Sequence, residues 1–367
     1  MYYGRQKRCE IIDIGERPEK PKVMQMEYLD KLLEKLTLAT GVGYSGNIKD
    51  VILQELQEYH VEARIEQDGS VYGCLKGQKD IGIMIACHID EVGFMVNSID
   101  DAGRISISGI GGVDVRILPG QEVIVRGKKE LKGYIGAKPP HLTTREERKK
   151  VLPIEKLFVD TGLIPREVKK LVKIGDCISF LGTYKKLQGN LRSVKALDNR
   201  ASIACGLLVL KELLQMERLY SLYFVATSQE EYTGLGARIH SYKLPIHYAI
   251  VVDVSHAEHP DLKDYECFPL NSGPVISRGA VIPEKLSDLL IEAAKEMEIS
   301  FQIEPLPTRT GTDADDIAFN REGIPTCVVG IPLRYMHTPV EVVSLKDIDR
   351  TKRLIINFVK RLEKSKK

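Results

Sequence analysis

The chain has 367 residues, of which 43% are hydrophobic and 28% are charged, and its formal net charge is +2 at pH 7. A chain of this length folds as one large domain or as two domains with separate cores. The near-neutral charge argues against a nucleic-acid-binding protein, because such proteins carry a concentrated positive surface. No apolar run approaches the roughly 20 residues of a membrane-spanning helix.

The N-terminal segment and the cysteines indicate where the protein works. The first residues, MYYGRQKRCEIIDIGERPEKPKV, lack the continuous apolar segment of a secretion signal. The seven cysteines are scattered and form no Cys-x-x-Cys pair, which argues against a disulfide framework and against a structural zinc site. We therefore expect a cytoplasmic protein that has neither a membrane nor nucleic acid as a partner.

The first part of the chain reads as an extension followed by an α/β segment. Residues 1–23 are polar and interrupted by prolines, and we interpret them as an N-terminal extension. Within residues 24–99, apolar spacing predicts amphipathic helices around 26–40 and 47–60. They are followed by IGIMIAC, an almost wholly apolar run that is typical of a strand buried on both faces of a sheet.

The pattern changes in residues 100–190, where short β-like stretches are broken by glycines. This pattern is typical of a small barrel or sandwich, so we predict a β-rich domain inserted into the first. We expect this insertion to serve as the dimerisation domain. In residues 191–367 helices and strands alternate again. Helices are expected around 198–218, 283–299 and 345–364, and strands around 220–228, 247–255 and 324–332. The predicted fold class is therefore α/β, with a helix-covered, mainly parallel sheet whose sites gather beyond the carboxyl ends of the strands.

Five acidic and imidazole side chains stand in separate fragments near the ends of these apolar runs. The fragments are IACHIDEVGF with His88, KALDNRAS with Asp198, SQEEYTGLGA with Glu231, VVDVSHAEH with Asp253 and YMHTPVEVV with His337. Imidazole and carboxylate ligands suit zinc, cobalt or manganese. Two divalent ions roughly 3.5–4 Å apart need a bridging ligand and further ligands on each ion.

The five residues can be divided between two such ions. Asp198 is the expected bridge, because a carboxylate can give one oxygen to each ion. One ion then takes His88 and Asp253, and the other takes Glu231 and His337. The set is sufficient for a two-metal hydrolase site.

Two further acidic residues have expected roles beside these ligands. Glu230 precedes a ligand and stays free to act as general base, taking a proton from metal-bound water and returning it to the leaving amine. Asp90 lies two residues after His88. We expect its carboxylate to accept the other ring N–H of His88 and to fix the imidazole tautomer.

Each predicted ligand also has an ordinary structural explanation. His88 after an apolar strand could be a satisfied core or loop residue, the Glu230–Glu231 pair could be surface charge, and Asp198 could be a helix N-cap. His337 could be a plain loop residue. Asp253 is harder to explain in this way, because a carboxylate within VVDV is costly to bury unpaired. All of these explanations would have to hold together for there to be no site.

The same fragments resemble the tetrahedral aminopeptidases, a metallopeptidase family that includes deblocking, glutamyl and leucyl aminopeptidases and members labelled endoglucanase. The resemblance rests on CHIDEVGF, KALDNR, SQEEYTGLGA, VVDVSHAEH, TGTDADDI and GIPLRYMHTPVEVVSLKDI, and runs from about residue 24 to 365. It implies a zinc-peptidase α/β domain, an inserted barrel-like or PDZ-like domain, and hollow homo-oligomers built from dimers, often dodecamers. It also implies metal ligands at His88, Asp198, Glu231, Asp253 and His337, a base at Glu230 and a histidine-orienting aspartate at Asp90.

We therefore expect an aminopeptidase that binds two divalent ions per chain, with zinc and cobalt ahead of manganese, and hydrolyses the N-terminal bond of short peptides. The acidic site favours a positively charged α-amino group. Thr312 and Asp313, in TGTDADDI, are expected either to line the substrate pocket or to form a turn and helix cap.

Two other functions are less consistent with these residues. A glycoside hydrolase places two carboxyl groups about 5 Å or about 6.5–9.5 Å apart, whereas Glu230 and Glu231 are sequence neighbours whose side chains should diverge. The chain also has no tryptophan and few aromatic residues to stack on sugars. A non-catalytic peptide-binding or chaperone-like assembly has no reason to keep Glu230.

Overall fold

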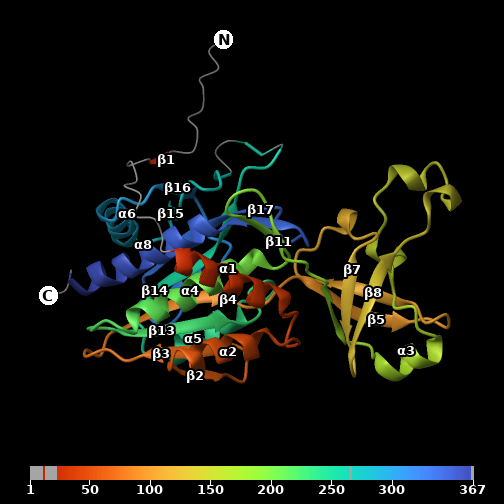
Figure 1. The fold of residues 1–367 in the computed structure, drawn as a ribbon, viewed down its shortest axis with the longest axis horizontal. Coiled ribbons are helices and arrows are strands. Elements are labelled where there is room, and N and C mark those ends of the chain that lie inside the picture. Colours follow the sequence, from red (N-terminus) through yellow and green to blue (C-terminus); the bar gives the residue numbers. More distant parts are fainter. Residues whose placement is uncertain (1–10, 13–22, 261, 264–266, 365–367) are drawn as a thin grey trace, which may run out of the picture.

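The computed structural model describes residues 11–12, 23–260, 262–263 and 267–364. Figure 1 shows a large α/β part with a small β-barrel beside it. This arrangement confirms the predicted α/β fold class, with its helix-covered sheet and its small barrel. No helix within the described ranges is both long enough and apolar enough to cross a membrane.

The large part is built on a 12-stranded sheet whose centre is parallel. The central order is β17-β14-β4-β13, and each neighbouring pair in it is parallel, while most pairings outside this centre are antiparallel. Every residue of β4 is buried, as its apolar sequence predicts for a strand covered on both faces. The strands are β1 (Ile11–Ile12), β2 (Glu62–Ile65), β3 (Val71–Leu75), β4 (Gly82–His88), β11 (Lys185–Lys186), β12 (Leu191–Val194), β13 (Ser221–Thr227), β14 (Tyr248–His256), β15 (Val275–Gly279), β16 (Phe301–Leu306), β17 (Thr326–Arg334) and β18 (Glu341–Ser344).

Helices bury their apolar faces against this sheet in one continuous core. α4 packs on β4 and β14 and contacts both α1 and α8, while α5 packs against α7. The helices predicted from apolar spacing all form, and α8 covers the whole predicted 345–364 segment. The helices of this part are α1 (Val23–Leu38), α2 (Ile48–Glu58), α4 (Leu197–Leu213), α5 (Leu235–Lys243), α6 (Glu284–Glu296), α7 (Ala314–Ala318) and α8 (Leu345–Lys364).

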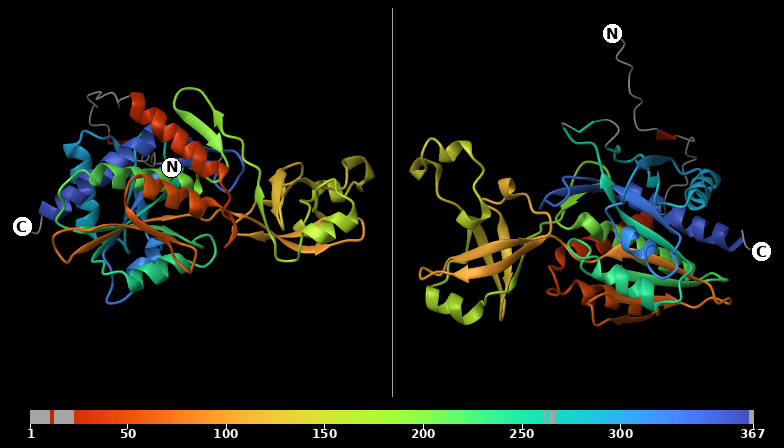
Figure 2. Two further views of the ribbon diagram at one scale, coloured as in Figure 1. Left: turned by 60° about the horizontal axis from the view of Figure 1, so that its bottom comes forward. Right: turned by 180° about the vertical axis from the view of Figure 1, so that it is seen from behind.

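The barrel is closed, with strand order β10-β5-β6-β9-β8-β7. It has its own core, in which Phe94 and Phe180 meet edge-on with ring centroids 5.3 Å apart. Figure 2 shows it beside the large part from two further directions. Its elements are β5 (Gly93–Ile99), β6 (Ile105–Ile110), β7 (Glu122–Arg126), β8 (Glu130–Gly136), β9 (Phe158–Asp160), α3 (Pro165–Leu171), β10 (Cys177–Phe180) and the 3-10 turns η1 (Val115–Ile117), η2 (Pro140–Leu142), η3 (Glu147–Lys149) and η4 (Ile154–Lys156).

The first barrel strand, β5, begins five residues after β4 ends. The predicted division into 24–99 with 191–367 and an inserted 100–190 stays a prediction, and so does the dimerisation role of the insertion. The predicted extension, 1–23, lies outside the described residues except for β1 and Val23. β1 pairs antiparallel with β16 at one edge of the sheet.

A buried ion pair joins α1 to the β11–β12 hairpin. Arg192 donates two hydrogen bonds to Asp30, from Nε to Oδ1 at 2.7 Å and from Nη2 to Oδ2 at 2.8 Å. The Tyr184 hydroxyl donates to the same carboxylate at 2.6 Å, and Lys186 lies 2.9 Å from it. Burial alone would raise the pKa of Asp30, but these donors hold it well below its usual range. The carboxylate is therefore ionised in the folded protein at neutral pH.

We expect Asp30→Asn to lower the free energy of unfolding at pH 7 by about 3–5 kcal/mol, because it leaves the Arg192 charge buried without its partner. A carboxyl pKa that folding lowers contributes stability above its unfolded value of about 4 and loses it as pH falls below that value. The wild-type advantage should therefore shrink between pH 5 and pH 3 in urea titrations.

The matched control for this ion pair is Lys186→Ala, since the Lys186 side chain is 64% exposed. Exposed pairs contribute about 0–1 kcal/mol. If Asp30→Asn proved as stable as Lys186→Ala at pH 7, the buried pair would not stabilise this part of the fold.

Candidate active site

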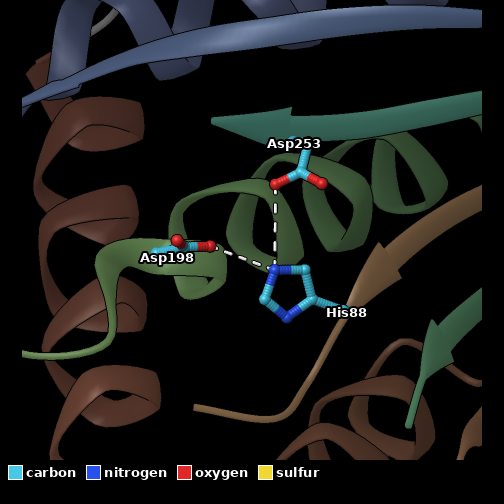
Figure 3. A group of neighbouring side chains, drawn as sticks. All are labelled: His88, Asp198 and Asp253. Atoms are coloured by element: carbon cyan, nitrogen blue, oxygen red, sulfur yellow. Dashed lines mark hydrogen bonds and ion pairs between the residues drawn. The ribbon is translucent and has the colours of Figure 1, made fainter. Parts of the chain in front are cut away.

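The sheet register brings His88 and Asp253 together. His88 ends β4 and pairs with Thr227, the last residue of β13. Val251 of β14 pairs with Ala86 of β4, so the same register places Asp253 beside His88. His88 Nε2 lies 3.8 Å from Asp253 Oδ1, and the two side chains point toward each other (Figure 3). β14 continues past Asp253 to His256, close to the predicted strand around 247–255.

Asp198 approaches this pair from the beginning of α4. Its backbone is non-helical (φ −78, ψ 102), and the N-cap position of α4 falls on Ala196. Asp198 Oδ1 lies 3.0 Å from His88 Nε2, and Oδ2 lies 3.3 Å from His337 Nε2. One carboxylate therefore faces both imidazoles with different oxygens, which is the geometry that a bridging ligand requires.

His337 reaches the site from the loop between β17 and β18. Its Nε2 lies 3.3 Å from Glu231 Oε2. Its other ring nitrogen, Nδ1, lies 3.0 Å from the carbonyl oxygen of Gly112, a barrel-side residue. Because a carbonyl only accepts, Nδ1 carries the proton in the neutral ring and Nε2 presents its lone pair to the site.

The five predicted ligands thus converge into two groups that share Asp198. One group is His88, Asp198 and Asp253, and the other is Asp198, Glu231 and His337. Within each group the candidate ligand atoms all lie within 4.8 Å of one another. The division of residues is the one that the sequence predicted for two ions.

Glu230 stands in the same site but belongs to neither group. Its Oε2 lies 3.9 Å from His88 Nε2, and its side chain is 16% exposed. Asp90 fixes the backbone at this point, because its two oxygens accept the N–H groups of Glu230 at 3.0 Å and Glu231 at 3.1 Å. Asp90 Oδ1 lies 3.7 Å from His88 Nδ1, which is an ion-pair distance longer than a hydrogen bond. The predicted contact to the ring of His88 is therefore electrostatic in this structure.

The pKa values show how burial and mutual proximity affect these groups in the absence of a cation. Burial raises the pKa of Glu230 to about 9 and that of Asp253 to about 8, and neighbouring carboxylates add to both shifts. Burial alone would lower the pKa of His337, but Asp198 and Glu231 raise it to about 11. Four carboxyl groups and two imidazoles thus share a buried site in which, without a cation, Glu230 and Asp253 hold their protons at neutral pH. A divalent cation would favour the ionised forms of both, and this donor set fits two such cations.

Asp313 and Thr312, the two predicted substrate-pocket residues, have different surroundings in the structure. Asp313 is 2% exposed and accepts a hydrogen bond from the Thr227 hydroxyl. Burial raises its pKa to about 6, and the nearby His88 opposes that shift. The Thr312 hydroxyl accepts the Ala314 N–H at 3.2 Å at the start of α7, which is the predicted turn and cap. Substrate contact by either residue stays a prediction.

Two clefts flank the site where barrel-side loops meet the sheet. One, of about 740 Å³, is lined by Gln229 and Tyr232 together with barrel-side residues. The other, of about 660 Å³, is lined by Met336 and Thr338, which flank His337, and by Asp114 from the barrel side. The barrel therefore forms part of the walls around the candidate site.

Comparison with known proteins finds peptidases that are similar to this chain along most of its length. The model of the M42 glutamyl aminopeptidase family matches residues 69–354. A lysyl aminopeptidase of Pyrococcus furiosus is 34% identical over 332 residues, covering 88% of this chain and 94% of the relative. A TET aminopeptidase from a marine-sediment Thaumarchaeota archaeon has a TM-score of 0.87 and 30% identity, covering 92% of this chain and 98% of that chain.

Two other solved structures carry informative names. The Pyrococcus horikoshii TET1 peptidase, which can assemble into a tetrahedron or a large octahedral shell, has a TM-score of 0.79 and 28% identity, covering 90% of this chain and 99% of that chain. A Thermotoga maritima protein named endoglucanase has a TM-score of 0.72 and 30% identity, covering 90% of this chain and 99% of that chain.

The fold and the grouped acidic and imidazole side chains define the class of protein as a peptidase, a hydrolase of peptide bonds. The chain belongs to the M42 glutamyl aminopeptidase family. The predicted resemblance to the tetrahedral aminopeptidases is confirmed.

Proposed function

We propose that this protein is a dinuclear-metal aminopeptidase that removes the N-terminal residue of short peptides. The observation that carries the proposal is the sharing of Asp198 between two ligand groups, with Glu230 beside them and in neither. His88 and Asp253 would complete the ligands of one ion, and Glu231 and His337 those of the other. Zinc and cobalt suit this donor set best, and manganese is a third option.

When bound, two such ions lower the pKa of a water molecule and polarise a carbonyl oxygen. Glu230 is the proposed general base, because its partly exposed carboxylate is held in place through its own backbone N–H. It takes a proton from the attacking water and returns it to the leaving amine. Asp90 keeps Glu230 and Glu231 in this position by accepting both of their N–H groups.

The acidic character of the site also supports action on chain ends. A substrate α-ammonium group brings positive charge to carboxyl groups whose ionised forms burial disfavours, whereas the interior of a chain brings none. A glycoside hydrolase, which the name of the Thermotoga maritima protein suggests, would leave His88 and His337 without a role. A non-catalytic binding protein would leave Glu230 without one.

We further propose that the chain forms a homo-oligomer built from dimers, a proposal supported by the similar P. horikoshii peptidase, which can assemble into a tetrahedron or a large octahedral shell. The barrel is the proposed dimerisation domain, and its exposed apolar side chains support this role. They include Leu142, Val151, Ile164 and Ile174. The proposed oligomer is a dodecamer. We also propose a cytoplasmic location, because the scattered cysteines suit a reducing compartment.

The test compares matched peptides with free and acetylated N-termini, using mass spectrometry to identify the products. We expect stepwise loss of N-terminal residues from the free peptides only. Internal cleavage of both peptides would point to an endopeptidase. Release of reducing sugar from a soluble β-glucan, with both peptides left intact, would support the glycosidase.

A second prediction concerns the barrel-side carbonyl that holds His337. A Cβ added at Gly112 would lie 3.0 Å from His337 Nδ1 and 3.3 Å from its Cε1. We expect Gly112→Ala to displace the ring and weaken cobalt binding by about 10–100-fold, as measured by equilibrium dialysis. Gly109→Ala is the control, since its added Cβ meets no atom within 4 Å. Equal cobalt affinity in the two variants would mean that Gly112 does not position His337.

A further inference from the structure

Glu341 is a buried carboxylate that is bonded to the backbone of two proposed ligands at once. It is the first residue of β18 and is 2% exposed. Its Oε1 accepts the N–H of His337 at 2.8 Å, and its Oε2 accepts the N–H of Asp198 at 3.0 Å. Both oxygens thus accept hydrogen bonds from the main-chain amides of proposed ligands.

The strand pairing explains how one side chain reaches both. β18 runs antiparallel to β12, and Glu341 stands opposite Val194 in the register. Asp198 comes four residues after Val194, and His337 comes four residues before Glu341. The two strands therefore deliver both proposed ligands to the same end of the pair, where the carboxylate lies between their backbones.

Neither amide has a partner in regular secondary structure. Asp198 stands in the first turn of α4, where N–H groups have no acceptor within the helix. His337 lies in a loop and has a φ of 61°, a left-handed conformation that is uncommon for a residue other than glycine. The bonds from Glu341 satisfy both groups and fix the backbone from which each proposed ligand projects.

Two buried cations accompany this carboxylate. Lys195 is 2% exposed and Arg200 is 0% exposed, and both interact electrostatically with Glu341. Lys195 also forms an ion pair with Glu91 at 2.6 Å. Burial and the nearby Asp198 raise the pKa of Glu341, whereas its two backbone N–H donors favour the ionised form, as do these cations.

We propose that Glu341 is a positioning residue that sets the bridging carboxylate and the His337 imidazole relative to each other before metal binds. The inference rests on the proposed function for the identity of Asp198 and His337 as ligands. Its physical basis is that hydrogen bonds to a ligand from a residue that does not itself bind the metal preorganise the ligand atoms. Such bonds therefore strengthen metal binding.

Glu341→Gln tests this role directly. A glutamine amide offers one oxygen and one NH₂ group, so one of the two backbone N–H groups would face another donor. We expect cobalt affinity, measured by equilibrium dialysis and by the visible absorption of bound Co²⁺, to fall by about 10–100-fold. The kcat/KM at limiting cobalt should fall with it and recover in part at saturating cobalt. Glu341→Asp, which keeps the charge but is too short to reach both amides, is the second variant and should change affinity in the same direction.

Asp347→Asn is the matched control. Asp347 is also fully buried and also accepts two backbone N–H groups, from Asn271 at 2.7 Å and from Gly273 at 2.9 Å, but neither residue is a proposed ligand. Both substitutions should lower the Tm of the metal-free protein, while only the Glu341 variants should lose cobalt affinity.

The outcomes separate the two proposals. Equal cobalt affinity in wild type and both Glu341 variants would overturn the positioning role while leaving the proposed function in place. Equal loss in the Asp347 control would overturn it too, since the effect would then follow from stability alone. A wild-type protein that binds no cobalt would overturn the proposed function and the positioning role together.

Discussion

Glu230→Gln is expected to lower kcat/KM by about 10²–10⁴-fold while cobalt binding and the fold are retained. The amide is close in size to the carboxylate but cannot accept a proton at neutral pH. Glu230 lies outside both ligand groups, so its replacement should not remove an ion. Steady-state hydrolysis of an aminoacyl-p-nitroanilide, together with the cobalt stoichiometry of the same sample, measures both parts of the prediction.

The neighbouring Glu231→Gln provides the control for this variant. Glu231 is grouped with Asp198 and His337, so its substitution should weaken the binding of one ion as well as reduce activity. A Glu230→Gln protein that lost cobalt as Glu231→Gln does would show Glu230 to be a ligand. A Glu230→Gln protein with unchanged kcat/KM would exclude it as the base.

Asp198→Ala is expected to have the broadest effect, because it removes the one residue that both ligand groups share. We expect both ions to bind weakly and kcat/KM to fall by about 10³-fold or more, since metal ions supply several kcal/mol of transition-state stabilisation. Cobalt stoichiometry after dialysis and the remaining hydrolysis rate are the measurements.

Asp253→Ala is the comparison for this prediction, since Asp253 belongs to only one ligand group. That variant should weaken one ion and leave the other. If Asp198→Ala kept one ion at wild-type affinity, as Asp253→Ala should, Asp198 would be a terminal ligand and not a bridge.

Much of this account could be predicted from the sequence because the signals are local. The apolar IGIMIAC run predicted a buried strand, and the structure confirms it as β4. The five ligand fragments could be recognised because a carboxylate or an imidazole beside a buried strand is costly without a partner. The same reasoning could have found Glu341, since it follows Val340 in PVEVV, begins the otherwise largely apolar strand β18 and is buried in the structure.

Other features depend on tertiary contacts that no local pattern encodes. The carbonyl of Gly112 meets His337 across 225 residues of sequence. Asp90 was expected to bond the ring of His88, but its oxygens accept the N–H groups of Glu230 and Glu231, which lie 140 and 141 residues away. Spacing along the chain shows that Asp90 lies close to His88, but the strand pairing decides which donors reach its oxygens.

The most direct test of the central claim is a cobalt titration of metal-stripped protein, followed by hydrolysis of a panel of aminoacyl-p-nitroanilides. We expect no release without metal, and activity that rises with cobalt and reaches its plateau at two ions per chain. The panel would also identify the preferred N-terminal residue. Full activity in the stripped protein with chelator present, or no release from any substrate with two ions bound, would contradict a dinuclear-metal aminopeptidase.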